Sequence, residues 1–315
     1  MDLRLDSEQD SIVDAVAALL RRGGRPPERA RQVSGRLDAE ALRRLDDTGF
    51  LDVAGDGSPR GHLTALLITE QAARDLVSAP VGARALVAAY TGVPDPPRAI
   101  GLAFGQRSIV RWGTDVDAVL MLDGAAVRLL PAGEVTAERV PSRMTYPLAR
   151  VSARPGRGTL LGDGAAARMT RAWRAGLAAE IAAAMTGAVD VARAHVTART
   201  QFGRPIGSLQ AVQHRLAEAH VQAQGSMWLA RRAAWDLGSD RQAALAAAYA
   251  ASAAGPVFDA VHQVVGAIGF TTEFDLHLWS LRLPVLAAEL GGPRAHAAAA
   301  AAAQWPARAQ GPARG

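Results

Sequence analysis

The sequence contains no cysteine and no lysine, and only 5% of its 315 residues are aromatic. The absence of cysteine excludes disulfides, thiolate nucleophiles and metal sites with cysteine ligands. Every basic side chain other than histidine is an arginine, and the arginines occur along most of the chain rather than in one stripe with interleaved aromatic residues. The formal net charge of +5 therefore does not indicate a nucleic-acid partner.

Long uncharged apolar runs are also scarce. The N-terminus, Met1–Asp6, is polar and lacks the apolar core of a signal peptide. Outside the alanine-rich C-terminal part, no stretch of about 18 residues is both apolar and free of charge. We therefore expect no membrane span and a cytoplasmic protein. His277 and His296 have no partners at metal-ligand spacing, and we expect no metal site.

The residues that are abundant favour helices. Alanine has the highest helix propensity, and it dominates this composition. In the first part of the chain, apolar residues recur at helical spacing. This pattern predicts helices over residues 11–20, 38–47, 63–76 and 81–90. The stretch 91–97 is rich in proline and glycine, which predicts a linker.

The pattern changes after this linker. Residues 99–161 hold short apolar runs separated by turn signals, and Asp123-Gly124 between two of the runs predicts a hairpin. Helical patterns return from about residue 168, and four antiparallel helices with short connections predict a bundle. These helices are expected over 172–198, 208–237, 240–265 with an interruption near Gly255-Pro256, and 275–303 with breaks at Pro284 and Gly291-Gly292.

The predicted organisation is mainly α with a small β domain. We expect an N-terminal helical domain over 1–97, a reduced β domain over 98–165, a C-terminal four-helix bundle over 166–305 and a disordered tail over 306–315. The chain is long enough for such units to share a sizeable buried core.

The most informative stretch, residues 199–207, lies at the predicted end of one long helix, before a Gly/Pro turn and a second helix. Arginine suits a diphosphate because its planar fork donates two parallel charge-assisted hydrogen bonds and stays charged. Each residue alone has a simpler explanation. Arg199 complements a helix C-terminus, Gln201 faces water and Phe202 joins the core. The combined string is more specific than its parts.

A second stretch, residues 262–273, supports the first. Small residues at Gly266, Ala267 and Gly269 let backbone N–H groups approach a ligand closely, which suits a phosphate. The alternative explanation is a helix C-cap followed by a turn.

Both stretches resemble motifs of the acyl-CoA dehydrogenase family, in the same order and at similar separation. The matching positions in the first motif are Arg199, Gln201, Phe202, Gly203, Pro205, Ile206, Gln210, Leu216 and Ala217. Those in the second are Gln263, Gly266, Gly269, Phe270, Thr271, Glu273 and Arg282, with Ala267 where the family has glycine. The resemblance implies a helical domain, a β domain and a four-helix domain, with FAD bound across a subunit interface. It implies FAD-binding roles for Arg199, Gln201, Phe202, Gln263, Gly266 and Gly269, the first three reaching a neighbouring subunit's flavin.

Two family features are missing. The Thr-Glu-Pro-x-x-Gly-Ser-Asp-like loop of the middle domain is absent, and the β domain is short. The family also needs a carboxylate that removes a proton from the thioester substrate. One family position falls on Gly291, with Glu289 about two residues out of register. The other falls near residues 171–174, which hold no acid, with Glu180 further along the same helix. We therefore assign no catalytic base.

The resemblance and these gaps together suggest an FAD-dependent subunit for the α,β-desaturation of an acyl-CoA or acyl-carrier thioester in lipid or steroid metabolism. It is expected in a homo- or heterotetramer, most simply with a longer acyl-CoA dehydrogenase subunit that supplies the base, as in heteromeric actinobacterial enzymes. Two alternatives stay open: a non-catalytic family member that stabilises a partner, and a tailoring flavoenzyme of the same fold.

Overall fold

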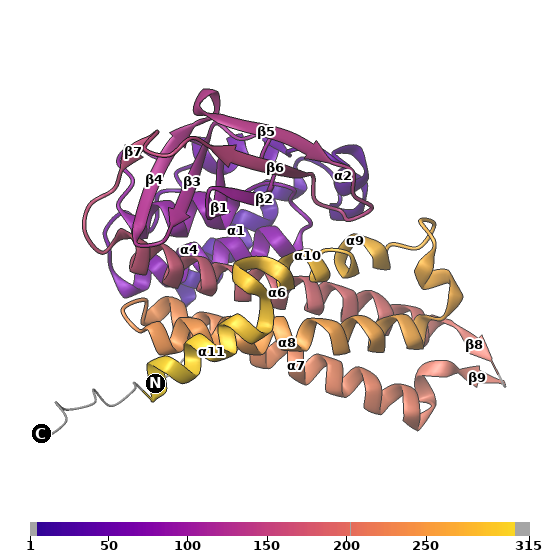
Figure 1. Cartoon of the computed structure of the whole chain (residues 1–315). Coiled ribbons are helices and arrows are strands. Elements are labelled where there is room, and N and C mark those ends of the chain that lie inside the picture. The colour runs from indigo at the N-terminus through magenta and orange to yellow at the C-terminus, as the bar shows by residue number, and fades with distance from the viewer. Residues whose placement is uncertain (1–4, 202, 306–315) are drawn as a thin grey trace, which may run out of the picture.

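The computed structural model describes residues 5–201 and 203–305, and Figure 1 shows its course. The N-terminal part is helical, and its first helix begins at a reciprocal cap. Asp6 accepts a hydrogen bond from the Gln9 N–H (2.9 Å), and the Gln9 side chain accepts one from the Asp6 N–H (3.1 Å). The helices are α1 (Ser7–Arg21), α2 (Pro26–Gln32), α3 (Ala39–Asp47), α4 (Pro59–Arg74), the π-helical η1 (Ala83–Ala88) and α5 (Ala89–Thr91).

Two small sheets form the β domain. One has the strand order β1-β3-β4-β7, with β1 parallel to β3, and the other has the order β2-β6-β5, with all neighbours antiparallel. The Asp123-Gly124 hairpin is confirmed, because β3 and β4 pair from Asp123 opposite Ala126 onwards. The strands are β1 (Ile100–Phe104), β2 (Arg107–Arg111), β3 (Ala118–Asp123), β4 (Ala126–Pro131), β5 (Val135–Val140), β6 (Leu148–Ala153) and β7 (Thr159–Leu160).

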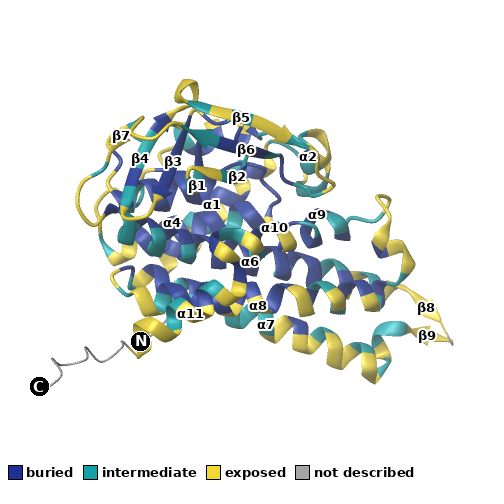
Figure 2. Ribbon diagram, viewed as in Figure 1, coloured by how far each residue is buried: buried dark blue, intermediate teal, exposed yellow. Residues whose placement is uncertain are grey.

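The C-terminal part is a helical bundle that lies below the sheets in Figure 1. Its longest helix, α6, is largely buried, as the dark ribbon in Figure 2 shows, and its buried positions are mostly alanine. Small side chains let helices approach closely, which gives the abundant alanine a packing role. The elements are α6 (Ala165–Ala198), β8 (Thr200–Gln201), β9 (Arg204–Pro205), η3 (Ile206–Ser208), α7 (Gln210–Trp235), α8 (Asp240–Val265), η4 (Ala267–Phe270), α9 (Leu276–Ser280), α10 (Leu283–Ala288), η5 (Glu289–Gly291) and α11 (Gly292–Gln304).

The structure differs from the sequence-based expectations at three places. Helix α2 was not expected, and residues 83–88 form a π-helix rather than an α-helix. The predicted interruption near Pro256 is wrong, because α8 continues through it. Pro256 is exposed, so water can bond the carbonyl that proline leaves without an N–H partner. The domain limits near 97 and 165 stay a prediction.

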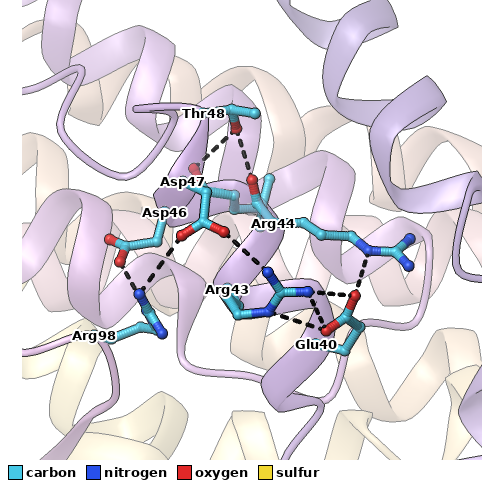
Figure 3. Close-up of polar contacts among 8 residues, drawn as sticks. Glu40, Arg43, Arg44, Asp46, Asp47, Thr48 and Arg98 are labelled. Carbon is cyan, nitrogen blue, oxygen red and sulfur yellow. Dashed lines mark hydrogen bonds and ion pairs between the residues drawn. The ribbon is translucent and has the colours of Figure 1, made fainter.

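The surface of α3 carries a network of ion pairs (Figure 3). Glu40 pairs with Arg43 (2.7 Å) and Arg44 (2.9 Å), while Arg98, just after the linker, reaches back to Asp46 (2.7 Å). All of these except Asp46 and Arg44 have side chains more than 40% exposed, so each pair contributes little to stability. The network connects the start of the β domain to α3 on an exposed surface and does not mark a reactive site.

Helices α6 and α8 are long and apolar enough to cross a membrane by length and composition alone, although the sequence predicted no such segment. In the fold, 83% of the most apolar window of α6 and 56% of that of α8 are buried inside the protein. Both are core helices of the bundle.

Candidate functional site

The first motif forms a short hairpin at one end of the bundle. Arg199 is the C-cap of α6 and has extended backbone angles, which turn the chain out of the helix. Its carbonyl accepts a hydrogen bond from the Ile206 N–H (2.9 Å), which closes the loop, and β8 pairs with β9. Figure 1 shows this hairpin projecting beyond the helices. Such a hairpin is well placed to reach another molecule.

The side chains of the hairpin are exposed. Arg199 has no acidic partner among the described residues. The pKa of His195 on α6 is lowered mainly by the burial of His195, and the charge of Arg199 lowers it further. Gln201 is exposed, and its amide donates to the Thr200 carbonyl (2.8 Å). Phe202 lies outside the described residues. An unpaired guanidinium and an exposed amide are chemically suited to a diphosphate.

The second motif lies at the same end of the bundle. Helix α8 ends there, and the ring of Phe274, in the segment that follows, packs edge-on against His195 of α6 with centroids 5.1 Å apart. Gln263 is exposed on the last turn of α8. The structure therefore brings the two motifs into one region, and their joint role in cofactor binding stays a prediction.

The two glycines of this motif have internal roles. Gly266 has φ 78°, a conformation that favours glycine, and its N–H donates to the His262 carbonyl (2.9 Å). The Gly269 N–H donates to the Gly266 carbonyl (3.0 Å), and a Cβ at Gly269 would lie 3.1 Å from Val265. Both amides are engaged within the loop. In this structure the glycines shape the turn, and their role toward a ligand stays a prediction.

A basic face on the β domain was missed by the sequence analysis. Two adjoining open hollows, of about 770 and 600 Å³, lie over β2, β6 and β5. Four arginines line them and form no ion pair within the described part of the chain: Arg107, Arg150, Arg154 and Arg157. Strand pairing could have revealed part of this face. Arg107 and Ile109 lie on the same face of β2, and Ile109 lies opposite Arg150 of β6, so Arg107 and Arg150 share that face.

The structure also brings together three charged side chains that are distant in the sequence. Arg111 of β2 donates to both carboxylate oxygens of Glu180 on α6 (3.1 and 2.8 Å), and its Nε donates to Glu289 in η5 (2.6 Å). The second Glu289 oxygen accepts a hydrogen bond from Trp173 Nε1 (2.7 Å). We call Arg111, Glu180 and Glu289 the junction triad. Their side chains are 11%, 11% and 16% exposed.

The electrostatics of the junction triad follow from burial and pairing. Burial acts to lower the pKa of Arg111, but Glu180 and Glu289 outweigh it and raise that pKa. Burial raises the pKa of Glu289, Arg111 opposes this, and Glu180 adds to it. The guanidinium also lies over Trp112 and Tyr146, 4.9 and 5.0 Å from the ring centroids.

The two carboxylates of the triad are the acids that the sequence placed near, but outside, the family's base positions. The structure places both at one small cavity of about 20 Å³, between the N-terminal helices, the β domain and α6. The remaining wall is largely apolar and includes Ile100 and Leu102. Gly291, on which one of the family's base positions falls, carries no side chain and has φ 88°. Sequence spacing identified the two acids; nothing in it pointed to Arg111.

Comparison with known proteins relates the sequence of this chain to one family. Residues 162–304 match the model of the acyl-CoA dehydrogenase C-terminal domain. The chain is 36% identical over 199 residues to acyl-CoA dehydrogenase IpdE2 of Mycolicibacterium smegmatis, covering 62% of this chain and 61% of that protein. It is 34% identical over 277 residues to acyl-CoA dehydrogenase FadE34 of Mycobacterium tuberculosis, covering 76% of this chain and 38% of that protein. The chain thus spans less than two thirds of either relative.

The fold agrees with this relationship over nearly the whole chain. A crystal structure of the ChsE4–ChsE5 complex from Mycobacterium tuberculosis contains a chain that matches with a TM-score of 0.79 at 21% identity, covering 95% of this chain and 97% of that one. The expected fold class, mainly helical with a small β domain and a C-terminal helical bundle, is therefore confirmed. The protein described here belongs to the acyl-CoA dehydrogenase family.

Proposed function

We propose that this chain is a subunit of an FAD-dependent acyl-CoA dehydrogenase in which a longer partner subunit supplies the catalytic base. The reaction is the α,β-desaturation of an acyl thioester, in lipid or steroid metabolism and in the cytoplasm. The observation that carries the proposal is the projecting hairpin with an exposed guanidinium at Arg199 that has no acidic partner in the described structure.

The residues of the hairpin fit the diphosphate part of FAD by chemistry and exposure. Arg199 would hold the diphosphate with two parallel hydrogen bonds, and Gln201 and Gln263 offer amides nearby. The bound flavin would supply the hydride acceptor. Because the hairpin projects from the end of the bundle and Arg199 at its base is exposed, we expect Arg199 to serve a flavin bound largely by the partner.

The heteromeric assembly is supported by the fold comparison and by the junction triad. The ChsE4–ChsE5 structure is of a complex of two proteins. In the chain described here, both candidate carboxylates are held by one arginine, so neither is free to take a proton from a substrate. A partner that contributes its own base resolves this gap.

The proposal is tested by co-expressing the chain with a longer acyl-CoA dehydrogenase and recording the visible spectrum of the purified complex. We expect flavin absorbance in the complex. Arg199→Ala should lose at least tenfold in flavin affinity, because it removes a charge-assisted pair worth about 1.5–3 kcal/mol, with little change in thermal stability. Arg193→Ala, also exposed on α6, is the matched control. Wild-type flavin stoichiometry in Arg199→Ala would show that this arginine does not bind the cofactor.

A second function is favoured by the junction triad. A family member whose own carboxylates are paired could stabilise a partner without binding flavin. That function predicts a tight but colourless complex, and the same spectrum distinguishes the two.

A further inference from the structure

The junction triad connects parts of the fold that are far apart in the sequence. Arg111 ends a strand of the β domain, Glu180 lies on α6, and Glu289 lies in the short η5 connection before α11. The triad therefore joins the small domain to the bundle through side chains. Every terminal oxygen of the two acids receives a hydrogen bond.

The backbone next to the triad supports a positioned arrangement. Trp112 follows Arg111 and has φ 56°, and Leu290 follows Glu289 and has φ 51°. These are two of the four residues other than glycine with positive φ in the described chain. Such conformations persist only where surrounding contacts hold them. The fold therefore fixes both ends of the triad in place.

The space beside the triad is too small for a substrate. A cavity of about 20 Å³ holds about one water molecule. Arg111, Glu180 and Glu289 line this cavity together with the apolar Ile100 and Leu102, and the guanidinium group donates hydrogen bonds to both carboxylates. A thioester cannot contact either acid while Arg111 occupies this position.

We propose that Arg111 closes this chain's own carboxylate site and locks the β domain to the bundle. It is a positioning residue that keeps Glu180 and Glu289 paired and out of reach of substrate. With these acids closed off, desaturation takes place only at the partner's site, a consequence that rests on the proposed function. The closure itself does not depend on flavin.

Closure is tested on the full chain by thermal unfolding and chemical rescue. Arg111→Ala leaves two buried, unpaired carboxylates, so we expect Tm to fall by about 10 °C. Guanidinium chloride at low millimolar concentration should restore part of that loss by entering the vacated space. Arg107→Ala, on the same strand and face but exposed, should show neither effect. If guanidinium raises the Tm of Arg111→Ala by no more than it raises the Tm of Arg107→Ala, the closure is wrong.

A second variant keeps the inference testable if Arg111→Ala does not fold. R111M/E180M/E289M replaces all three charges by apolar side chains, and removal of a complete buried ion cluster is far less damaging than removal of one member. We expect this variant to melt within about 5 °C of wild type. A loss as large as that of Arg111→Ala would overturn the lock.

Activity of the complex with its partner separates this inference from the proposed function. Glu289→Gln should leave kcat per flavin within twofold of wild type. A fall of a hundredfold or more in kcat with unchanged Tm would make Glu289 a base and overturn the closure. Absence of flavin or activity in the wild-type complex would contradict the proposed function but would leave the rescue result to decide the lock.

Discussion

At the scale of single residues, the protein buries histidine as well as paired charge. His296 on α11 is completely buried, and burial together with Arg174 lowers its pKa to about 4. The folded protein thus keeps this imidazole neutral, whereas the unfolded chain takes up a proton near pH 6.5. The contribution of His296 to stability is present above pH 6.5 and is lost as the pH falls toward 4.

This difference gives a pH prediction. We expect His296 to contribute up to about 3 kcal/mol to the loss of unfolding free energy between pH 7 and pH 4. His296→Leu should unfold with a shallower pH dependence, measured by urea denaturation at several pH values. His214→Asn, at an exposed position, should follow the wild-type curve. Parallel curves for His296→Leu and wild type would mean that His296 titrates alike in both states.

At the scale of elements, some contacts could be read from the sequence and others could not. The 3.6-residue periodicity predicted the long helices, and Gly291-Gly292 correctly predicted a break, because both residues have positive φ. Helix α2 was missed because it is short and carries little apolar pattern. The junction triad was missed because its partners are 69 and 178 residues from Arg111 in the sequence, and side-chain pairing at that range leaves no local pattern.

One contact between helices can be tested at this scale. Gly187 of α6 lies against the ring of Trp279 of α9, and a Cβ there would approach the ring atoms closer than real contacts allow. We expect Gly187→Ala to lower the free energy of unfolding by about 1–3 kcal/mol through overpacking, measured by urea denaturation. Gly162→Ala, with open space around its Cβ position, is the control. Equal stability of the two variants would mean that α9 shifts freely.

At the scale of the whole molecule, the family and the helical architecture could be predicted from two motifs and the distribution of alanine. The site could be predicted only in part. The motifs identified the hairpin end of the bundle, but the basic face of β2, β6 and β5 depends on how strands pair. Partner identity depends on surfaces that no single sequence displays.

Assembly is the prediction that belongs to this scale. We expect native mass spectrometry of the co-expressed proteins to show a tetramer with two copies of each chain. The hairpin extends outward from the bundle, and in the function we propose its motif residues serve a site shared with a neighbouring subunit. Chain expressed alone should contain less flavin per protomer than the complex. Equal flavin content in both samples would argue for a self-sufficient homomer.

Helix α6 carries both the hairpin cap and Glu180, and at 1.5 Å per residue the two are about 28 Å apart. At that distance a side chain at one end of the helix makes no direct contact with groups at the other end. Substitutions near the sheets can therefore remove a reactive group while the hairpin at the other end of α6 keeps its conformation. In the function we propose, a chain without its own base would still contribute to the complex through the hairpin that it offers to its neighbour.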